Sequence, residues 1–435
     1  MYCIYSLIII IYFLVNLPYF FYQCIKNKKY KQGLLERLGF FPSEIFRKNK
    51  NEKLAWFHAV SVGETVALEI LLKKFKARFP NYKILISNIT NTGHERAKKV
   101  KEADFVFYLP LDIAIITNKV SEKVKPDLFV IIETEIWPNI LRSMKNQDAK
   151  IALVNGRISD KSYGGYKKLA FFFKKVLDNF DIICMQNDEY RDRIITMGAR
   201  SKKVKVTGNI KFDMLPESST LNNNQNLYAE FGLPENTLVF TAASTHHPEE
   251  DIILNIYTNL KKKFPDLYLV LVPRHPERRN EITKTCKDLN LKYSLRSQIK
   301  EGKKYNKRNS EQILILDTIG ELISIYAISD LIFMGKSLEK PGGGHNILEP
   351  SAFSKPVIWG KYMSNFREIE KILLRNNAGI KVESNIELEN QITQLLESKE
   401  SREKIGRKAF EVLQANKGSS EKTLDLLDNI LKRTD

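Results

Sequence analysis

Short apolar runs rich in Val, Ile and Phe alternate with longer segments of helical period through most of this chain, and this alternation constrains the fold most strongly. It is typical of parallel strands joined by crossover helices, so it predicts an α/β architecture. One helical segment, residues 66–79, places Leu68, Leu71, Leu72 and Phe75 on one face, as an amphipathic crossover helix requires. The strands expected in the first half are residues 54–58, 83–87, 105–109, 128–132, 151–154 and 182–185.

The same alternation begins again after a stretch with almost no apolar residues, PESSTLNNNQN at residues 216–226, which is typical of a linker. Two Rossmann-like domains that present the carboxyl ends of their strands to each other would face a common cleft, where open α/β sheets bind ligands. The second set of expected strands is 238–242, 268–272, 313–316, 331–334 and 356–359. The expected domains are 54–215 and 237–400, with a linker at 216–236 and C-terminal helices at 401–435 that have the option of packing back on the first domain.

The first 25 residues carry no charged side chain and are long enough, as a helix, for a hydrocarbon core of roughly 30 Å. Four lysines follow between residues 26 and 31, and no small-residue cleavage site is present, which argues against a cleaved signal peptide. Because cationic flanks stay in the cytoplasm, the sequence predicts a single N-terminal anchor with the rest of the chain on the cytoplasmic side of a membrane. Pro18 leaves open a full span or a shallow interfacial helix. Residues 26–53 form a basic collar, either a solvated linker or a surface that faces anionic phospholipid.

The chain of 435 residues has 69 Lys+Arg against 51 Asp+Glu, a net charge of +18, which predicts an anionic partner. Nucleic acid is disfavoured, because the basic residues are spread along the chain instead of forming one stripe with stacking aromatics. The four cysteines, Cys3, Cys24, Cys184 and Cys286, show no CxxC spacing, so we expect a reducing compartment and no structural metal.

Glu64 stands where the first expected strand turns into the helix of residues 66–79, in the sequence SVGETVA. One interpretation is structural, since a carboxylate in a first helical turn gains a few tenths to about 1 kcal/mol from the helix dipole. The other is catalytic, since a general base needs a carboxylate held within hydrogen-bond reach of the hydroxyl that it deprotonates.

Glu133 and Glu135 follow another expected strand, in the sequence ETEIWPN. If the strand continues through them, alternation puts both carboxylates on one face. In one interpretation, one of the two carboxylates contacts the substrate. In the other, they are only polar residues of a solvated turn.

Arg274, His275 and Arg278 lie in a loop after the expected strand 268–272. Arginine is always charged and can donate two parallel hydrogen bonds to a phosphate group, so the loop is suited to bind a nucleotide phosphate. The alternative interpretation is an ordinary basic surface loop.

Glycines at Gly320 and at 342–344 allow a ligand to approach the backbone, and a helix starting near Asn346 offers an anion site at its N-terminus. Glu349 is better matched to ribose hydroxyls than to phosphate. Neither GxGxxG after a first strand nor GxxxxGK[ST] occurs, so the sequence disfavours a dinucleotide fingerprint and a P-loop.

Thr245, His246 and His247 are weak candidates for metal ligands, because adjacent histidines point in different directions and no third ligand lies nearby in sequence. With no DxD motif in the chain, we expect no obligatory metal and no cofactor.

Together these motifs resemble the 3-deoxy-D-manno-octulosonic acid (Kdo) transferases of lipopolysaccharide synthesis. The matching segments, in order, are SVGETVA at 61–67, ETEIWPN at 133–139, GNIKFD at 208–213, PRHPER at 273–278, GEL at 320–322 and GGHNILEP at 343–350. The resemblance covers almost the whole chain. It implies a GT-B glycosyltransferase that moves Kdo with inversion from CMP-Kdo to a lipid A precursor, lipid IVA, at the cytoplasmic face of the inner membrane.

Site residues follow from the resemblance by matching motif. Glu64 would accept the proton of the sugar hydroxyl. The residues implied for CMP binding are Pro273, Arg274, Ile319, Gly320, Glu321, Asn346, Ile347, Leu348 and Glu349. Those implied for the acceptor or donor sugar are Glu133, Lys211, Ser244, Thr245 and His246. The alternative is another membrane-associated GT-B enzyme that uses a UDP-sugar and a lipid acceptor.

Overall fold

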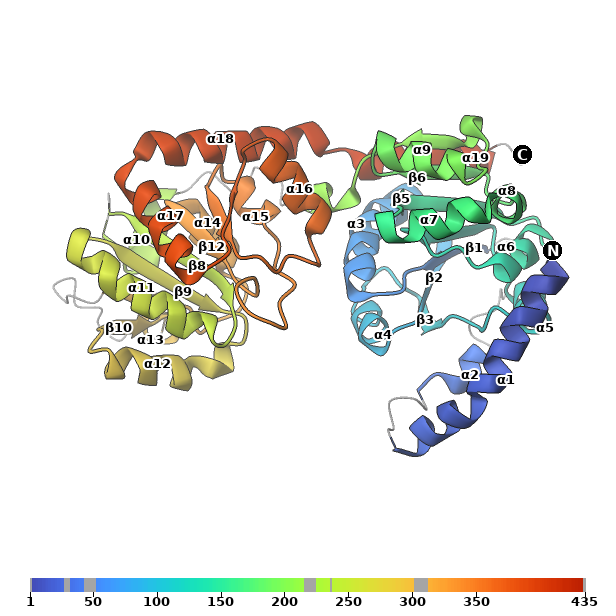
Figure 1. Ribbon diagram of the computed structural model, residues 1–435, viewed down its shortest axis with the longest axis horizontal. Coiled ribbons are helices and arrows are strands. Elements are labelled where there is room, and N and C mark those ends of the chain that lie inside the picture. Colours follow the sequence, from blue (N-terminus) through green and yellow to red (C-terminus); the bar gives the residue numbers. More distant parts are fainter. Residues whose placement is uncertain are drawn as a thin grey trace. The chain divides into compact units, whose positions relative to one another are not determined.

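The computed structural model describes six segments of the chain, residues 2–26, 32–42, 52–214, 224–234, 237–300 and 312–432. It divides into two compact units, unit 1 (Met1–Met214 and Asn416–Asp435) and unit 2 (Leu215–Ala415). Each unit is a parallel-sheet α/β structure (Figure 1), which confirms the expected fold class. Residues 27–31 and 43–51 of the expected collar, and residues 216–223 and 235–236 of the expected linker, lie outside the described residues.

Unit 1 is built on a seven-stranded parallel sheet with the order β3-β2-β1-β4-β5-β6-β7. Its strands are β1 (Lys53–His58), β2 (Tyr82–Asn88), β3 (Phe105–Tyr108), β4 (Leu128–Ile132), β5 (Lys150–Gly156), β6 (Ile182–Met185) and β7 (Val204–Val206). The six expected strands are present. The sequence missed β7 because it has three residues, two of them exposed, and so forms no apolar run.

Helices cover the sheet of unit 1, and both of its faces are buried. The helices of this unit are α1 (Tyr2–Lys26), α2 (Leu34–Arg37), α3 (Val62–Arg78), α4 (Asn91–Ala97), α5 (Ala114–Val124), α6 (Pro138–Lys145), α7 (Asp160–Lys168), α8 (Ala170–Leu177), α9 (Asp188–Thr196) and α19 (Ser419–Lys432), with short 3-10 turns η3 (Ser201–Lys203) and η4 (Ile210–Asp213). Because side chains alternate along a strand, Trp56 of β1 packs with Phe129 in one core, whereas Phe57 packs with Val130 in the other. The four side chains expected on one face of the helix at 66–79 are all fully buried in α3, which confirms that amphipathic helix.

Unit 2 repeats the architecture with the strand order β10-β11-β9-β8-β12-β13-β14. Its strands are β8 (Val239–Thr245), β9 (Tyr268–Pro273), β10 (Tyr293–Leu295), β11 (Ile313–Ile315), β12 (Leu331–Met334), β13 (Val357–Trp359) and β14 (Ile380–Lys381). The five expected strands are present. The sequence missed β10 and β14, which form the two edges of the sheet, because they are short and only partly buried.

The helices of unit 2 begin inside the segment expected to be a linker. They are α10 (Asn224–Glu230), α11 (Glu249–Lys263), α12 (Arg279–Asp288), α13 (Arg296–Lys300), α14 (Leu322–Ile328), α15 (Leu348–Ser351), α16 (Arg367–Arg375), α17 (Asn385–Glu397) and α18 (Lys399–Asn416), with a 3-10 turn η6 (Pro276–Arg278). In α10, Tyr228 donates its hydroxyl to Ile328 O of α14 at 3.3 Å. Residues 224–230 therefore pack as part of unit 2.

The chain returns to unit 1 through its last helix, α19. The backbone N–H groups of Gly418 and Ser420 donate to the carboxylate of Asp213 at 2.7 and 2.6 Å. Asp425 of α19 pairs with Arg78 of α3 at 2.6 Å. These contacts fix α19 on unit 1, while nearly all of α18 belongs to unit 2.

The N-terminal helix α1 is long and apolar enough to cross a membrane over Tyr2–Tyr19, and this stretch is not buried in the protein. No other helix in the described segments passes the same test. The helix is compatible with the expected anchor.

Candidate active site

The polar residues of unit 1 that the sequence singled out gather at the topological switch point of its sheet. Strand β1 has β2 on one side and β4 on the other, so the winding reverses between β1 and β4. Ligands of open α/β sheets bind at the carboxyl ends of the strands at such a point. Glu64 comes just after β1, and Glu133 directly follows β4.

The carboxylate of Glu64 is held in one orientation by the start of α3. Ser61 is the N-cap residue, and its hydroxyl donates to Glu64 Oε1 at 2.8 Å. The backbone N–H of Val60 donates to Glu64 Oε2 at 2.7 Å. This is a variant of the capping box, so the geometry supports the helix-capping role of Glu64. The same two hydrogen bonds also fix the position of a carboxylate at the switch point.

Glu64 differs from an ordinary cap in its proton affinity. The residue is 8% exposed. Burial raises the pKa of Glu64 to about 7, and the charge on Glu133 contributes to the rise, whereas the hydrogen bonds from Val60 and Ser61 oppose it. A carboxyl group with a pKa near the working pH is suited to general base catalysis, because it is partly ionised and still accepts a proton.

Glu133 has a φ of 62°, so β4 ends at Ile132 and does not continue through Glu135. The condition for the two carboxylates to share a strand face is therefore not met. Glu133 Oε2 instead accepts a hydrogen bond from Arg157 Nε at 2.6 Å. The pKa of Glu135 is raised by burial and by the charge on Glu133, so the two groups still influence each other.

Two cations, Arg157 and Lys211, complete the cluster in unit 1. Arg157 directly follows β5, and Lys211 lies in η4. Burial lowers the pKa of Lys211, and the charges on Glu133 and Glu64 oppose this change. A Cβ built on Gly63 would lie 3.8 Å from Lys211 Nζ, so the ammonium group lies beside the start of α3. The structure thus brings Glu64, Glu133 and Lys211 together and adds Arg157, which the sequence reasoning missed.

Unit 2 has an equivalent switch point between β8 and β12. The carboxylate of Glu249, the first residue of α11, joins the loops that follow these two strands. It accepts the backbone N–H groups of His246 at 3.0 Å, Lys336 at 2.6 Å, Ser337 at 2.8 Å and Leu338 at 3.0 Å. Glu249 was not a candidate in the sequence, yet it fixes the backbone on which His246 and Lys336 stand.

His246 and His345 face each other in this part of unit 2. Their Nε2 atoms are 2.9 Å apart and their rings are nearly parallel, at 13°. Burial lowers the pKa of His246 to about 4 and that of His345 to about 3, and neighbouring cations, including Lys336 and Arg274, lower both further. Both imidazoles are therefore neutral at pH 7. The cationic surroundings favour an anionic ligand here.

Arg274 directly follows β9 with an exposed side chain, and its backbone N–H donates to Thr245 O at 2.9 Å. Arg278, by contrast, pairs with Glu250 at 2.9 Å and with Glu281 at 2.9 Å. Within the described ranges no carboxylate pairs with Arg274. Of the two arginines in the expected phosphate loop, Arg274 is thus the one whose guanidinium is available to a ligand.

Ser244, Thr245 and Pro273 lie at the ends of β8 and β9, and all three are buried. Ser244 has a φ of 55°. The Oγ1 atom of Thr245 is buried without a hydrogen-bond partner in the described part of the molecule. The strand ends therefore place these side chains close to Arg274.

Asn346 and Glu349 form a small hydrogen-bonded group. Asn346 Nδ2 donates to Glu349 Oε1 at 3.2 Å, and Tyr326 donates its hydroxyl to Glu349 Oε2 at 3.4 Å. Helix α15 starts at Leu348, near Asn346 as expected, but it has only one turn, and its Leu348 N–H donates to Asn346 Oδ1 at 3.1 Å. It offers a weaker anion site than the sequence predicted. Ile347 and Leu348 are both fully buried, so the structure presents neither of them on its surface.

The segment from Ile319 to Glu321 lies at the start of α14. Ile319 is 87% exposed, and Gly320 has a φ of 91°, a left-handed conformation that favours glycine. The side chain of Glu321 is used internally, because its Oε1 accepts from Arg296 Nη2 at 2.8 Å and its Oε2 accepts from the hydroxyl of Thr318. Glu321 therefore fixes the conformation of this loop, and Ile319 and Gly320 are the residues that the loop exposes to a ligand.

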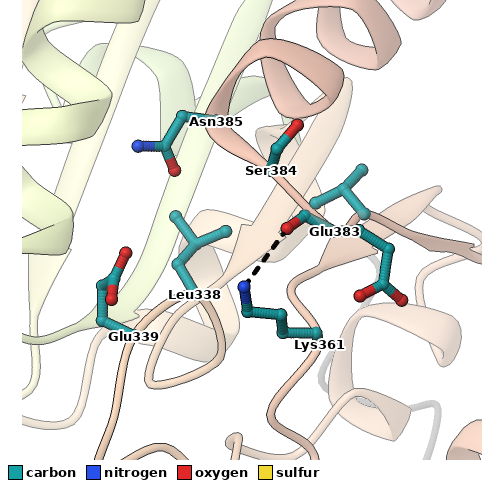
Figure 2. Close-up of a pocket in the computed structure, with 7 residues that line it drawn as sticks. Leu338, Glu339, Lys361, Glu383, Ser384 and Asn385 are labelled. Carbon is teal, nitrogen blue, oxygen red and sulfur yellow. Dashed lines mark hydrogen bonds between the residues drawn. The ribbon is translucent and has the colours of Figure 1, made fainter.

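A pocket of about 210 Å³ lies near the carboxyl ends of β13 and β14 in unit 2 (Figure 2). Leu338, Lys361 and Ser384 are among the residues that line it, and Lys361 points toward the backbone oxygen of Glu383 (Figure 2). None of the residues expected to bind CMP lines this pocket. It is therefore separate from the group around Arg274.

Among the described residues, no group of three or more His, Cys, Asp or Glu side chains is arranged to hold a metal ion. His246 faces His345, whereas His247 lies 3.6 Å from Asp251, so the adjacent histidines do diverge. The expectation of a reaction without an obligatory metal stays a prediction.

Sequence signals existed for only part of what was missed. Arg157 is a charged residue that follows the apolar run of residues 151–154 after Asn155 and Gly156, a weaker form of the signal that identified Glu133. Glu249 reads in the sequence as an ordinary first-turn acid, and nothing in it indicates that four backbone N–H groups converge on its side chain.

Comparison with known proteins shows what the two halves of the chain are similar to. Residues 32–214 match the family described as 3-deoxy-D-manno-octulosonic-acid transferase (kdotransferase), and residues 229–412 match glycosyl transferases group 1. The 3-deoxy-D-manno-octulosonic acid transferase of Haemophilus influenzae is 35% identical over 420 residues, which cover 94% of this chain and 94% of that protein. The protein of the same name from Rickettsia felis is 36% identical over 354 residues, or 80% of this chain and 73% of that one. The UDP-GlcNAc 2-epimerase of Neisseria meningitidis covers 86% of this chain and 99% of its own at 16% identity with a TM-score of 0.55, a likeness of fold alone.

Proposed function

The chain belongs to the 3-deoxy-D-manno-octulosonic acid (Kdo) transferase family, and from this premise we propose that it transfers Kdo from CMP-Kdo to the lipid A precursor lipid IVA, with inversion, at the cytoplasmic face of the inner membrane. The observation that carries the proposal is the carboxylate of Glu64, which is oriented, buried and raised in pKa at the switch point of unit 1.

We assign Glu64 the role of general base. The oxygen of an acceptor hydroxyl attacks the anomeric carbon of Kdo, the bond from this carbon to the phosphate oxygen breaks, and CMP leaves with the electron pair. The proton of the hydroxyl passes to Glu64. A single displacement of this kind inverts the anomeric centre and needs one base on the side of the acceptor.

Lys211 and Arg157 keep the cluster around Glu64 from becoming purely acidic. Arg157 compensates the charge of Glu133 through its ion pair. Without this compensation, two ionised carboxylates beside a buried Glu64 would raise its pKa further and reduce the fraction of ionised base. Glu133, Arg157 and Lys211 are therefore proposed to tune the base and to contact sugar hydroxyls or carboxylate.

The donor side of the proposal rests on unit 2. Arg274 and Lys336 give the loops after β8, β9 and β12 a positive potential, which suits the phosphate of CMP, and the two neutral histidines beside them are available for hydrogen bonding. Glu349 and Asn346 offer acceptor and donor atoms that match ribose hydroxyls. The exposed Ile319 and the glycine beside it are proposed to meet the rest of the nucleotide through apolar contact and backbone atoms.

The acceptor assignment is supported by the apolar helix α1, because an enzyme tethered to a membrane meets a lipid acceptor by diffusion in two dimensions. The net charge of +18 favours both the anionic phospholipid surface and a phosphorylated lipid acceptor. No role for nucleic acid is proposed.

The test is a product analysis with the purified full chain, lipid IVA and CMP-Kdo. Mass spectrometry is expected to show the acceptor with one or more added Kdo residues, and NMR of the product is expected to show inversion at the anomeric carbon. Parallel reactions with UDP-sugars test the alternative donor class. Transfer from a UDP-sugar with none from CMP-Kdo would overturn the proposal.

A further inference from the structure

The first two turns of α1 are docked on unit 1. Tyr5 donates its hydroxyl to Asp112 Oδ2 at 2.8 Å, and Ser6 donates its hydroxyl to Asn139 Oδ1 at 3.2 Å. Asn179 donates its side-chain N–H to the hydroxyl of Tyr2 at 3.0 Å. Helix α1 starts beside α6 (Figure 1), in agreement with these contacts.

Asp112, which receives Tyr5, is a fixed part of the domain. It is 5% exposed and accepts the backbone N–H groups of Asn139 at 3.1 Å and Ile140 at 2.7 Å. The N-cap residue of α6, Trp137, makes no side-chain cap hydrogen bond, so Asp112 caps α6 from a neighbouring loop. The hydroxyl of Tyr5 therefore binds to a carboxylate that the fold has already positioned.

Aromatic contacts reinforce the docking. The rings of Tyr2 and Tyr5 lie 6.2 and 5.8 Å from the ring of Phe172 in α8, measured between centroids. The guanidinium of Arg142 in α6 stands 4.9 Å from the ring centroid of Tyr2. Three elements, α5 with its preceding loop, α6 and α8, thus surround the beginning of α1.

The chain beyond the other end of α1 is also attached to unit 1. The carboxylate of Glu36 accepts the backbone N–H of Tyr108 at 2.7 Å, and Arg37 donates to Ile89 O at 2.6 Å. The rings of Phe41 and Phe107 are 5.0 Å apart. A 25-residue helix is about 37 Å long. The start of a membrane-length helix and the segment of residues 36–41 that comes after it are therefore both attached to the same unit.

The polar residues of α1 form one stripe. Tyr2, Tyr5, Tyr12, Asn16 and Tyr19 follow one another at spacings of 3, 7, 4 and 3 residues, which places them on one helix face. The first two contact unit 1, so the stripe continues the docked face. Tyrosine prefers the boundary between headgroups and hydrocarbon, whereas a membrane-crossing helix would carry this stripe through the apolar centre.

The remaining surface of α1 is apolar and has no protein cover. Of the 19 large hydrophobic side chains that are well exposed among the described residues, seven lie on α1 outside the stripe, and three lie in unit 2. Phe171 of α8, beside the docking site, is 64% exposed, and Ile115 of α5 is 79% exposed. Exposed lysines flank this apolar surface on α7 and α8, at Lys167, Lys168, Lys174 and Lys175. Apolar side chains with a basic border match an anionic lipid surface.

We propose that α1 is a monotopic helix that lies in a single leaflet, with both of its ends and unit 1 on the same side of the bilayer. A bilayer-crossing α1 would carry Tyr2, Tyr5 and Ser6 to the opposite surface, roughly 30 Å away, and would break every contact that they make with unit 1. This inference rests on the proposed function, which attaches the enzyme to a membrane, and it adds how α1 is placed relative to the bilayer.

Protease protection tests this topology. One form of the full chain carries an epitope tag before Met1 and a matched control carries the same tag after Asp435, which follows α19 of unit 1. In sealed inverted inner-membrane vesicles we expect both tags to be digested, and in right-side-out vesicles we expect both to be protected. An N-terminal tag that is protected where the C-terminal tag is digested would overturn the proposal. Recovery of both forms in the soluble fraction would instead overturn the membrane attachment.

A cross-link tests the docking without a tag. Tyr2→Cys and Arg142→Cys, combined with Cys3→Ser, place two thiols on the contacting positions. A short bismaleimide added to membranes is expected to join them within one chain, as read by mass spectrometry of the linked peptides. The single variants are the control. Absence of the link in membranes, with efficient linking of the same protein in detergent, would show that α1 leaves unit 1 in the bilayer and contradict the proposal.

Discussion

Units 1 and 2 are both seven-stranded parallel sheets with a switch point beside their first strand, but they carry opposite chemistry at these points. After β1 and β4, unit 1 presents carboxylates, of which Glu64 has its pKa raised to about 7. After β8, β9 and β12, unit 2 presents cations and the pair His246 and His345, whose pKa values are lowered to about 4 and about 3. Burial pushes acid and base toward their neutral forms in both units.

This difference indicates that the strand order sets the position of each candidate site, whereas the residues in the loops after the strands set its charge and proton affinity. In unit 1 the second carboxylate, Glu133, raises the proton affinity of the first. In unit 2 burial, together with the neighbouring cations, keeps the histidines neutral, so the positive charge of this region lies on side chains such as the Arg274 guanidinium. One unit is thus equipped to take up a proton and the other to hold an anion.

The largest effect is expected from Glu64→Gln. The amide keeps the shape and an acceptor oxygen for the Val60 N–H but cannot take up the proton. We predict a loss of at least about 100-fold in turnover. The rate of Kdo transfer under saturating donor and acceptor measures it.

Glu387 provides the matched control for capping. It lies in the same Ser-x-x-Glu arrangement at the start of α17, where its Oε2 accepts the Glu383 N–H at 2.8 Å. Glu387→Gln removes the same charge from the same kind of cap and is expected to leave turnover unchanged. If Glu64→Gln keeps more than about a tenth of normal turnover, Glu64 is only a capping residue.

The second largest loss of activity is expected from substitution of Arg274, because its guanidinium can donate two hydrogen bonds to the departing phosphate. Arg274→Lys keeps the charge but loses the bidentate geometry, and Arg274→Ala loses both. We predict activity in the order wild type, Lys, Ala, with roughly a 10- to 100-fold loss for Ala, the value of a charge-assisted hydrogen bond. Arg375→Ala, an exposed arginine at the end of α16, controls for the loss of charge alone. Equal activity in Arg274→Ala and Arg375→Ala would exclude Arg274 from the donor site.

A smaller effect is expected from Glu133→Gln, and it concerns pH. A base works when deprotonated, so turnover falls as the pH drops through the pKa of Glu64, which the charge on Glu133 raises. Removal of this charge lowers the pKa, so the acidic limb of the rate profile shifts to lower pH, by on the order of 1 unit. An unchanged acidic limb would show that the limb reports a group other than Glu64.

The smallest effect on the chemistry is expected from removal of residues 1–25. The truncated protein is expected to leave membranes only partly, since each remaining lysine near an anionic surface contributes about 1 kcal/mol. High salt should complete the release, while transfer to a short-chain soluble acceptor stays near normal. Sedimentation with membranes that is equal at low and high salt would contradict an electrostatic second attachment.

The sequence predicted the long buried strands and α3 because their side chains must alternate or repeat with a helical period to fill the cores. It missed β7, β10 and β14, which are short and partly exposed, since edge strands bury too little apolar surface to leave a pattern.

For the site, the sequence identified residues that directly follow strands, such as Glu133 and Arg274, because topology carries such residues to the switch point. It could not identify Glu249, whose role depends on a loop 87 to 89 residues further along the chain. Nor could it identify the docking of Tyr5 on Asp112. An apolar segment of this length is equally consistent with a membrane-spanning helix and with an interfacial helix.

The division of labour between the units is tested most directly by titrating CMP into wild type, Glu64→Gln and Arg274→Ala by calorimetry. The account predicts that Glu64→Gln binds CMP with wild-type affinity although its turnover is lost, whereas Arg274→Ala loses affinity and turnover together. Loss of CMP affinity in Glu64→Gln, or wild-type affinity in Arg274→Ala, would contradict it.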